Sequence, residues 1–159
     1  MTTEQVIADR HVRWVFGWDR RAGDAPFGFR RVFGEFYDFD SADLRLYDDF
    51  DPEHRVATTA AAYGEIWEPA FREMVSAHHA VDDGPHVLAS GDLAVSTLRF
   101  VARIVTPEAV TDIRTTTSLV WRGTPDGWRI VREHNSTEVL PAGTLDGRFG
   151  WGACRSPVR

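Results

Sequence analysis

The sequence predicts an α+β domain, in which helices of the N-terminal half pack on an antiparallel sheet formed by the C-terminal half. Apolar residues recur at helical spacing in several segments before residue 78, whereas residues 80–139 consist of alternating or β-branched runs that Gly and Pro separate. Helices followed by consecutive strands are typical of α+β folds with a meandering sheet. We expect residues 1–140 to form this domain and residues 141–159 to form a Gly- and Pro-rich tail.

Two helices are expected in the first part of the chain. Thr2 and Gln5 have the spacing of a capping box that opens the first helix, and Gly23 can end it. Asp24 can cap a second helix that has Pro26 in its first turn. Both segments carry apolar residues along one side, as expected of helices that cover a sheet.

A third helix is expected over residues 59–77, where Pro69 must kink the helix or split it. Residues 44–50 form a short strand candidate before this helix. The strands expected after it are residues 80–82, 87–90, 93–105, 110–121 and 128–139.

The last two strands are expected to form a β-hairpin across a turn rich in Gly, Pro and Asp-Gly at residues 122–127. Because strand side chains alternate with period two, one face of the second strand is expected to carry Trp128, Ile130, Arg132, His134 and Ser136. That face begins apolar and ends polar, which suits a sheet that lines a pocket at one end. Glu133 and Asn135 are then expected to face solvent or a subunit interface.

Five segments occur in a characteristic order: a helix ending near residues 21–24, Leu-Tyr-Asp-Asp at 46–49, an Ala- and aromatic-rich helix, residues 91–95 and the closing hairpin. This order resembles the ketosteroid-isomerase-like superfamily, also called the nuclear-transport-factor-2-like fold, over residues 6–136. The resemblance implies a conical half-barrel, with a pocket between a curved antiparallel sheet and the helices, in a polyketide-cyclase-like branch. The superfamily includes isomerases, dehydratases, epoxide hydrolases, polyketide cyclases and non-catalytic association domains, so the fold does not select one function.

The resemblance also implies a general base. In steroid isomerases of this fold the base is an aspartate directly before a proline, and Asp51 precedes Pro52 here with a shorter spacer. A carboxylate at a pocket edge can shuttle a proton when an apolar wall raises its pKa. The alternative is that Asp51 caps the turn that Pro52 starts. The tyrosine donor of those enzymes corresponds to Trp14, whose indole cannot make the short hydrogen bond of a phenol, and this departure disfavours steroid isomerisation.

His134 is the leading catalytic candidate among the strand residues. An imidazole beside Arg132 on an inward face would titrate near neutrality and could serve as acid, base or donor. The alternative is a histidine that a neighbouring carboxylate or carbonyl holds for structure. Arg114 shares its face with Thr116 and Ser118 and is expected to bind a carboxylate or polarise a carbonyl in the pocket. The alternatives are that Asp112 or Glu133 neutralises this arginine, or that the hydroxyl residues form an exposed face.

The apolar wall of a ligand pocket is expected to come from aromatic residues of the helices, namely Trp14, Trp18, Phe36, Tyr63, Trp67 and Phe71. A metal site is disfavoured, because the adjacent His78 and His79 diverge and no cysteine accompanies them. No cofactor is expected.

Composition and charge restrict the partners. The formal net charge of −6 disfavours nucleic acid, and no apolar run approaches the length needed to span a bilayer. The first residues lack the features of a signal peptide, and the single Cys154 fits a cytoplasmic setting. A homodimer is expected on the outer sheet face, where Leu119 and Trp121 would lie opposite to Arg114. The tail, with Phe149 and Trp151, is expected to fray, or alternatively to fold over the pocket mouth or a partner subunit.

These observations predict a domain that binds a small molecule, and they favour a cofactor-free acid–base enzyme of the isomerase or lyase type. Its reaction would be an isomerisation, dehydration or cyclisation of an apolar, oxygenated substrate. The alternative is a non-catalytic association or ligand-sensing domain, in which the same aromatic rings fill the interior.

Overall fold

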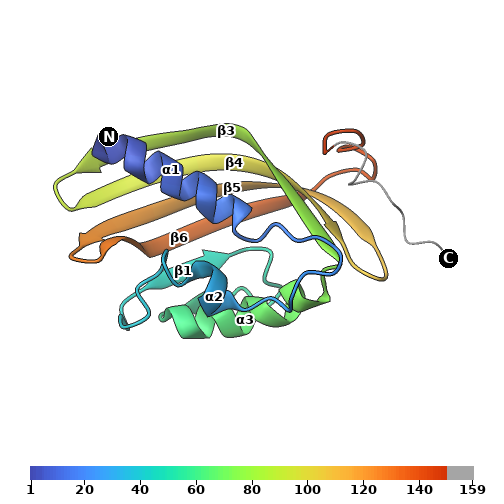
Figure 1. Cartoon of the computed structure of the whole chain (residues 1–159), viewed down its shortest axis with the longest axis horizontal. Coiled ribbons are helices and arrows are strands. Elements are labelled where there is room, and N and C mark those ends of the chain that lie inside the picture. The colour runs from blue at the N-terminus through green and yellow to red at the C-terminus, as the bar shows by residue number, and fades with distance from the viewer. Residues whose placement is uncertain (150–159) are drawn as a thin grey trace.

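The computed structural model describes residues 1–149, and these residues form the α+β arrangement that the sequence predicts (Figure 1). The strands form one curved, open sheet in the order β2-β1-β6-β5-β4-β3. α1 lies along β3 and β4, whereas α2 and α3 lie beside β1 and β2 (Figure 1). The described elements are α1 (Thr3–Phe16), α2 (Phe29–Phe33), β1 (Arg45–Asp48), β2 (Val56–Ala57), α3 (Ala60–Glu73), β3 (Ser76–Ser90), β4 (Leu93–Val105), β5 (Val110–Thr124) and β6 (Gly127–Val139).

The capping box at the start of α1 is confirmed. The Thr2 side chain accepts a hydrogen bond from the Gln5 backbone, and the Gln5 side chain accepts one from the Thr2 backbone. The helix ends at Phe16, well before the predicted stop at Gly23. The chain leaves the helix early because the backbones of Arg20 and Ala77 exchange two hydrogen bonds, of 2.9 and 3.0 Å, which tie this segment to the edge of the sheet.

The second helix is shorter than predicted. Asp24 does not cap it, because its carboxylate closes a turn by accepting a hydrogen bond from the Arg21 backbone at 2.8 Å. Gly28 is the N-cap of α2 instead, and Pro26 lies before the helix. Tyr37 therefore lies beyond the helix, on the irregular segment that leads to β1.

Thr59 caps α3 by accepting a hydrogen bond from the Ala62 backbone at 3.1 Å. The helix continues through Pro69 to Glu73 without being split. Residues 76–77, which were expected to belong to this helix, are the first residues of β3.

β3 is one strand where the sequence predicted two. Its register with β4 shifts between Val81 and His86, and pairing continues on both sides of the irregular stretch. Gly84 permits this, because its φ of +86° suits glycine and a Cβ at this position would lie 2.9 Å from the carbonyl oxygen of Thr97.

A β-bulge in β6 determines which side chains face the interior. Trp121 pairs with Ile130 and Val120 pairs with Arg132, so Val131 has no partner on β5. The extra residue reverses the alternation, because two residues on β6 now oppose one on its neighbour. After the bulge the inward side chains are Val131, Glu133, Asn135 and Thr137, and the outward ones are Arg132, His134 and Ser136.

The inward face of β5 is also opposite to the prediction. Leu119 and Trp121 are fully buried in the core, whereas Arg114 and Thr116 lie on the outer face. Leu119 and Trp121 therefore cannot supply the outer dimer surface that the sequence predicted.

β1 and β6 form the one parallel pair among the described strands of the sheet. Its register places Tyr47 opposite His134 and Asp48 opposite Asn135. Asp48 thereby approaches the inward residues of β6 although it lies far from them in sequence.

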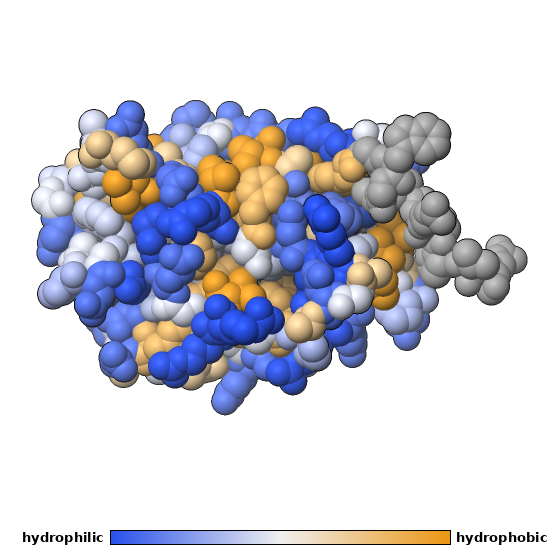
Figure 2. All heavy atoms as spheres, in the orientation of Figure 1, coloured by the Kyte–Doolittle hydropathy of each residue, from blue (hydrophilic) through white to orange (hydrophobic). Residues whose placement is uncertain are grey.

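The first part of the predicted tail folds against the sheet. Leu145 is buried and its backbone N–H donates to Asp112, while Arg103 forms ion pairs with Asp112 and Asp146. Residues 141–149 thus do not fray, whereas Trp151 lies outside the described residues. On the face seen in Figure 2, apolar side chains appear as scattered patches among polar ones. No helix of residues 1–149 is long and apolar enough to cross a membrane.

Candidate functional site

A cavity of about 220 Å³ lies between the sheet and the helices. It exceeds the volume of about 150 Å³ that suffices for a benzene ring in a protein core, so it has room for a larger ligand. Aromatic side chains dominate its wall, and polar side chains gather at the end formed by β1 and β6. The aromatic lining residues are Trp14, Trp18, Phe29, Phe33, Tyr37, Phe50, Tyr63, Trp67, Phe71 and Phe100.

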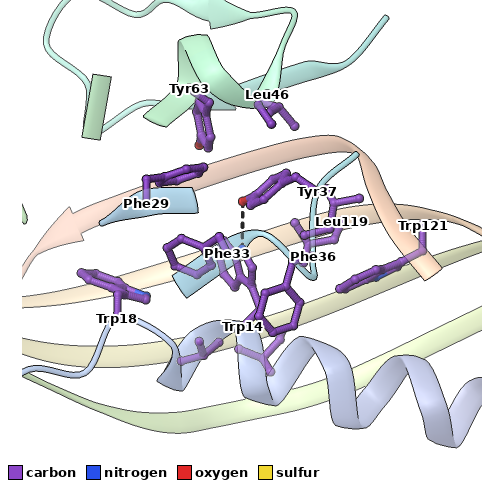
Figure 3. Close-up of a cluster of buried hydrophobic side chains, with 14 of the residues drawn as sticks. Trp14, Trp18, Phe29, Phe33, Phe36, Tyr37, Leu46, Tyr63, Leu119 and Trp121 are labelled. Carbon is purple, nitrogen blue, oxygen red and sulfur yellow. Dashed lines mark hydrogen bonds between the residues drawn. The ribbon is translucent and has the colours of Figure 1, made fainter. Parts of the chain in front are cut away.

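Five of the six aromatic residues expected in the pocket wall lie at the cavity. Trp14, Trp18, Tyr63, Trp67 and Phe71 all line the cavity. Phe71 stacks on Trp18 with ring centroids 5.2 Å apart, and on Trp67 with centroids 5.9 Å apart. Several of these rings converge on the space between the sheet and the helices in Figure 3.

Phe36 departs from the prediction, since it is buried in the core without lining the cavity.

Glu133 is the central polar residue of the cavity, and its side chain is 4% exposed. Tyr37 donates to Oε2 at 2.5 Å, and Tyr63 donates to Oε1 at 2.7 Å. The amide of Asn135 donates to Oε1 at 2.7 Å. One carboxyl group thus accepts three hydrogen bonds inside an aromatic wall.

Trp14 supports this arrangement from the first helix. Its indole Nε1 donates to the hydroxyl oxygen of Tyr37 at 2.9 Å, which is the dashed line in Figure 3. Tyr37 accepts this bond and donates its own proton to Glu133, so both bonds fix the orientation of its hydroxyl group. The indole therefore acts through Tyr37 instead of reaching the cavity's carboxyl group itself.

Asn135 joins two carboxyl groups. Its Nδ2 donates to Glu133 and also to Oδ2 of Asp48, at 3.1 Å. Its Oδ1 is buried and has no hydrogen-bond partner among the described residues. Asn135 lines the cavity, but this oxygen itself has almost no accessible surface.

The pKa values of both carboxyl groups are raised by burial. Loss of solvation raises the pKa of Glu133 to about 7, although the hydrogen bonds from Tyr37 and Tyr63 act in the opposite direction. Loss of solvation likewise raises the pKa of Asp48 to about 6. Neither carboxyl group forms an ion pair with any residue in the range 1–149. The site thus holds two carboxyl groups that can change charge near neutral pH.

Asp51 lines the cavity but is fixed as an anion. Arg55 donates to both of its carboxylate oxygens at 3.0 Å, and the backbones of Glu53 and Arg55 donate to it as well. These bonds hold the pKa of Asp51 well below its usual range, with the Arg55 side chain as the largest cause. The geometry matches the alternative in which Asp51 organises the turn at Pro52.

His134, Arg132 and Arg114 do not face the cavity, so the predicted orientation of all three is wrong. His134 is exposed on the outer face and packs against the ring of Tyr47. Arg132 donates to the backbone of Asp43. The physical reason for the first two errors is the bulge at Val131, because the prediction extended an unbroken alternation from Trp128.

Arg114 forms ion pairs with Glu138 and Asp82 on the outer face. Carboxylates thus neutralise this arginine, but they are not the predicted Asp112 or Glu133.

The sequence prediction missed four polar residues of the site: Tyr37, Asp48, Glu133 and Asn135. One signal was available in the sequence. Glu133 and Asn135 are two positions apart on the last strand and so share one face, and the residues that alternate with them could all face outward. Asp48 belongs to the Leu-Tyr-Asp-Asp stretch that carries the resemblance, but the proline after Asp51 indicates Asp51 as the base.

Comparison with known proteins agrees with this fold. The family described as the SnoaL-like domain matches residues 38–140. None of the curated proteins compared with the chain matches it.

Three solved structures illustrate the likeness of fold. An NTF2-like superfamily protein from Salmonella enterica serovar Typhimurium is 19% identical, with a TM-score of 0.66 over 91% of this chain and 96% of that chain. A proposed dehydratase of the NTF2-like family from Streptomyces avermitilis is 16% identical, with a TM-score of 0.66 over 86% of this chain and 96% of that chain. The CaMKII hub of S. rosetta is 16% identical, with a TM-score of 0.62 over 87% of this chain and 98% of that chain.

Proposed function

The chain belongs to the SnoaL-like domain family of the NTF2-like superfamily, and from the geometry of its cavity we propose that it is an acid–base enzyme for an apolar, oxygenated small molecule. The reaction would be an isomerisation, a dehydration or a cyclisation that needs only protein side chains. The observation that carries the proposal is Glu133, a buried carboxyl group held by two tyrosines at the polar end of an aromatic cavity.

Glu133 has the properties of a general base. With a pKa of about 7, set by loss of solvation, it is partly ionised at neutral pH and partly able to hold a proton. Tyr37 and Tyr63 fix both oxygens in place, which keeps the carboxylate in one orientation toward a bound ligand. We assign Glu133 the removal of a proton from the substrate.

Asp48 is suited to the opposite role. Its pKa of about 6, raised by burial, allows it to hold a proton for part of the time near neutrality. The amide of Asn135 contacts Asp48 and Glu133 together, so the two carboxyl groups lie beside one amide, and both residues line the cavity. Such a pair can take a proton from one atom of a substrate and return a proton to another.

The aromatic wall supports an apolar substrate. Rings such as Trp18, Trp67 and Phe71 offer flat apolar surface on one side of the cavity. The Streptomyces avermitilis relative in structure is described as a proposed dehydratase, which is compatible with this chemistry. The competing function is ligand binding or association without turnover. One of the proteins with a similar fold is named as a hub, the CaMKII hub of S. rosetta.

Proton transfer in the cavity can be tested with a tetralone that carries a β-hydroxyl group, incubated in deuterated water. We expect the wild-type protein to accelerate deuterium exchange beside the carbonyl and the loss of water, both followed by NMR. Glu133→Gln should reduce the rate to background, whereas His134→Gln should retain it, because the neighbouring His134 is on the outer face. Equal rates for wild type and Glu133→Gln would contradict the assignment of the base. Binding without any acceleration would favour the non-catalytic function.

The homodimer and the cytoplasmic location also remain proposals. Leu88 is 79% exposed and Val95 is 40% exposed, and the two residues pair across β3 and β4 on the outer face. They could supply the apolar contact that Leu119 and Trp121 cannot. Light scattering that shows only monomer at micromolar concentration would contradict the dimer.

A further inference from the structure

We propose that the cavity binds cations, and that its ligand is an apolar ring system that carries a protonated or quaternary amine. The inference rests on the site of the proposed function and gives its apolar, oxygenated substrate one further group. It follows from the balance of charged side chains that line the cavity and from the aromatic wall around them.

The charged side chains of the cavity do not balance. Among the residues that the structure describes, those that line it are Asp48, Asp51, Arg55 and Glu133. Arg55 is the one cation of this set, and it donates to both carboxylate oxygens of Asp51 at 3.0 Å and forms an ion pair with Glu53 at 2.9 Å. Its charge is therefore offset within its own turn. Asp48 and Glu133 have no cationic partner within residues 1–149, so the ionised cavity carries excess negative charge.

The elements around these two carboxyl groups supply no positive charge. The described lining residues of α1, α2, α3, β4 and β5 are aromatic or aliphatic, with Thr115 as the one polar addition besides the phenol of Tyr63. The phenols of Tyr37 and Tyr63 stay neutral, because burial raises the pKa of both well above the ordinary value of 10. A positive charge that compensates Asp48 and Glu133 must therefore come from the ligand.

The burial of Glu133 makes this attraction effective. Its side chain is 4% exposed, so the carboxyl group has already lost its water before any ligand arrives. Only the charge of the ligand must then leave water, and opposite charges attract more strongly where the dielectric constant is low. The attraction acts across the cavity, and it does not require a carboxylate oxygen that is open to direct contact.

The aromatic wall favours the same charge. Tyr37 and Tyr63 contact Glu133 directly, and Phe29 packs against both rings with centroids 5.6 and 6.1 Å away (Figure 3). Ring faces carry partial negative charge and attract cations, most strongly where water is excluded. A neutral ligand would use the apolar surface of the rings and leave both carboxyl groups unpaired, whereas an anionic ligand would add a further negative charge.

The test compares three ligands on one scaffold: 2-aminotetralin, 2-tetralol and tetralin-2-carboxylate, which are cationic, neutral and anionic at about pH 8. Calorimetry gives their dissociation constants with the wild-type protein. We expect the amine to bind at least about tenfold more tightly than the alcohol, and the carboxylate to bind more weakly than both. An alcohol or a carboxylate that binds as tightly as the amine, or an amine that does not bind at saturation, would overturn the proposal.

The affinity for the amine should rise with pH, because the two carboxyl groups attract the cation only when they are ionised. Burial raises the pKa of Glu133 to about 7 and that of Asp48 to about 6, whereas an alkylamine stays protonated up to about pH 10. Between about pH 5 and about pH 8 the dissociation constant of 2-aminotetralin should fall at least about tenfold, and that of 2-tetralol should change by less than about threefold. A preference for the amine that is the same at both pH values would contradict the role of these carboxyl groups.

Two substitutions on β6 locate the charge. Glu133→Gln keeps the size of the side chain and removes its charge, so the amine should bind at least about tenfold more weakly while the affinity for the alcohol changes little. Glu138→Gln is the matched control, because Glu138 pairs with Arg114 on the outer face, and it should change the affinity for the amine by less than about twofold. Equal effects of the two substitutions would contradict the proposal. The comparison of ligands on the wild-type protein and its pH dependence stand even where Glu133→Gln fails to fold.

Failure of this inference and failure of the proposed function give different results. A protein that accelerates proton transfer in the tetralone but binds the amine no better than the alcohol would keep Glu133 as the base and lose the cation site. A protein that prefers the amine but accelerates no proton transfer would keep the cation site and lose the enzyme.

Discussion

Tyr37 and Glu133 lie 96 positions apart in the chain, and the hydroxyl group of Tyr37 donates a 2.5 Å hydrogen bond to the buried carboxyl group of Glu133. The same hydroxyl oxygen accepts a bond from Trp14. This contact joins the first helix, the segment before β1 and the last strand at one point. It connects the stability of the fold to the charge of the proposed base.

Removing the phenol oxygen of Tyr37 should therefore have two effects. In Tyr37→Phe we expect the pKa of Glu133 to rise, because a bond that favours the carboxylate is lost, and the free energy of unfolding to fall by about 1–3 kcal/mol, because the Trp14 indole is left unpaired. Tyr63→Phe is the matched control, since Tyr63 also donates to Glu133 but has no bond to Trp14. In Tyr63→Phe the pKa of Glu133 should also rise, but the free energy of unfolding should fall by less than in Tyr37→Phe. NMR titration and denaturant unfolding measure the two quantities, and equal stability losses would argue against the role of Trp14.

The charge of Glu133 should govern both activity and stability as pH changes. Its pKa in the folded protein, raised by burial to about 7, lies above its ordinary value of 4.5. The folded state thus holds a proton that the unfolded state has released, so this contribution to stability is complete below about pH 4.5 and is lost as pH rises through about 7. We expect wild type to lose stability relative to Glu133→Gln over that window. Activity should rise over the same range, because the base acts when ionised, and an activity that falls there would contradict its assignment.

His11 should produce the opposite dependence on pH. Its ring is fully buried, Nδ1 lies 2.8 Å from the hydroxyl oxygen of Ser96, and burial lowers its pKa from 6.5 to about 3. Between these two pKa values the unfolded state binds a proton that the folded state does not bind. The contribution of His11 to the free energy of unfolding is therefore complete above about pH 6.5 and is lost as pH falls toward 3. The slope should be up to about 1.4 kcal/mol per pH unit. The difference in the free energy of unfolding between wild type and His11→Gln should change with pH in this window. A difference that is the same at every pH would show that His11 does not contribute.

Asp51 should behave as an organiser of its loop. In Asp51→Asn the ion pair with Arg55 is lost and the bonds to the backbones of Glu53 and Arg55 weaken, so we expect the melting temperature to fall by several degrees. Turnover by the folded fraction should stay within a few-fold of wild type, in contrast to Glu133→Gln. A complete loss of turnover with an unchanged melting temperature would restore Asp51 as the candidate base.

Local sequence signals were sufficient for the architecture. The capping box at Thr2 occurs as predicted, the third helix begins within one residue of its predicted start, and β4 has the predicted bounds. These features depend on residues within a few positions of one another, which a sequence displays directly. The aromatic wall was also predictable, because large rings at helical spacing on one side must pack against the sheet.

The identity of the polar residues was not predictable in the same way. Val131 gives no local sign that it forms a bulge, yet this one residue exchanges His134 for Glu133 on the inner face. The parallel pairing of β1 with β6, which sets Asp48 beside Asn135, is a contact between distant segments. Tyr37 enters the site because α2 ends early, at Phe33. Each of these depends on tertiary pairing and not on a local pattern.

The pKa of Glu133 is the most direct test of the central claim, that a buried carboxyl group between two tyrosines is the acid–base group of the cavity. It can be measured by NMR titration of the side-chain carboxyl carbon, with Glu133→Gln used to assign the signal. We predict a pKa of about 7, raised by burial, together with changes in the Tyr37 and Tyr63 ring signals over the same pH range. An ordinary value near 4.5, with tyrosine signals that do not respond, would show that the carboxyl group is solvated and unlinked to them, and would contradict the claim.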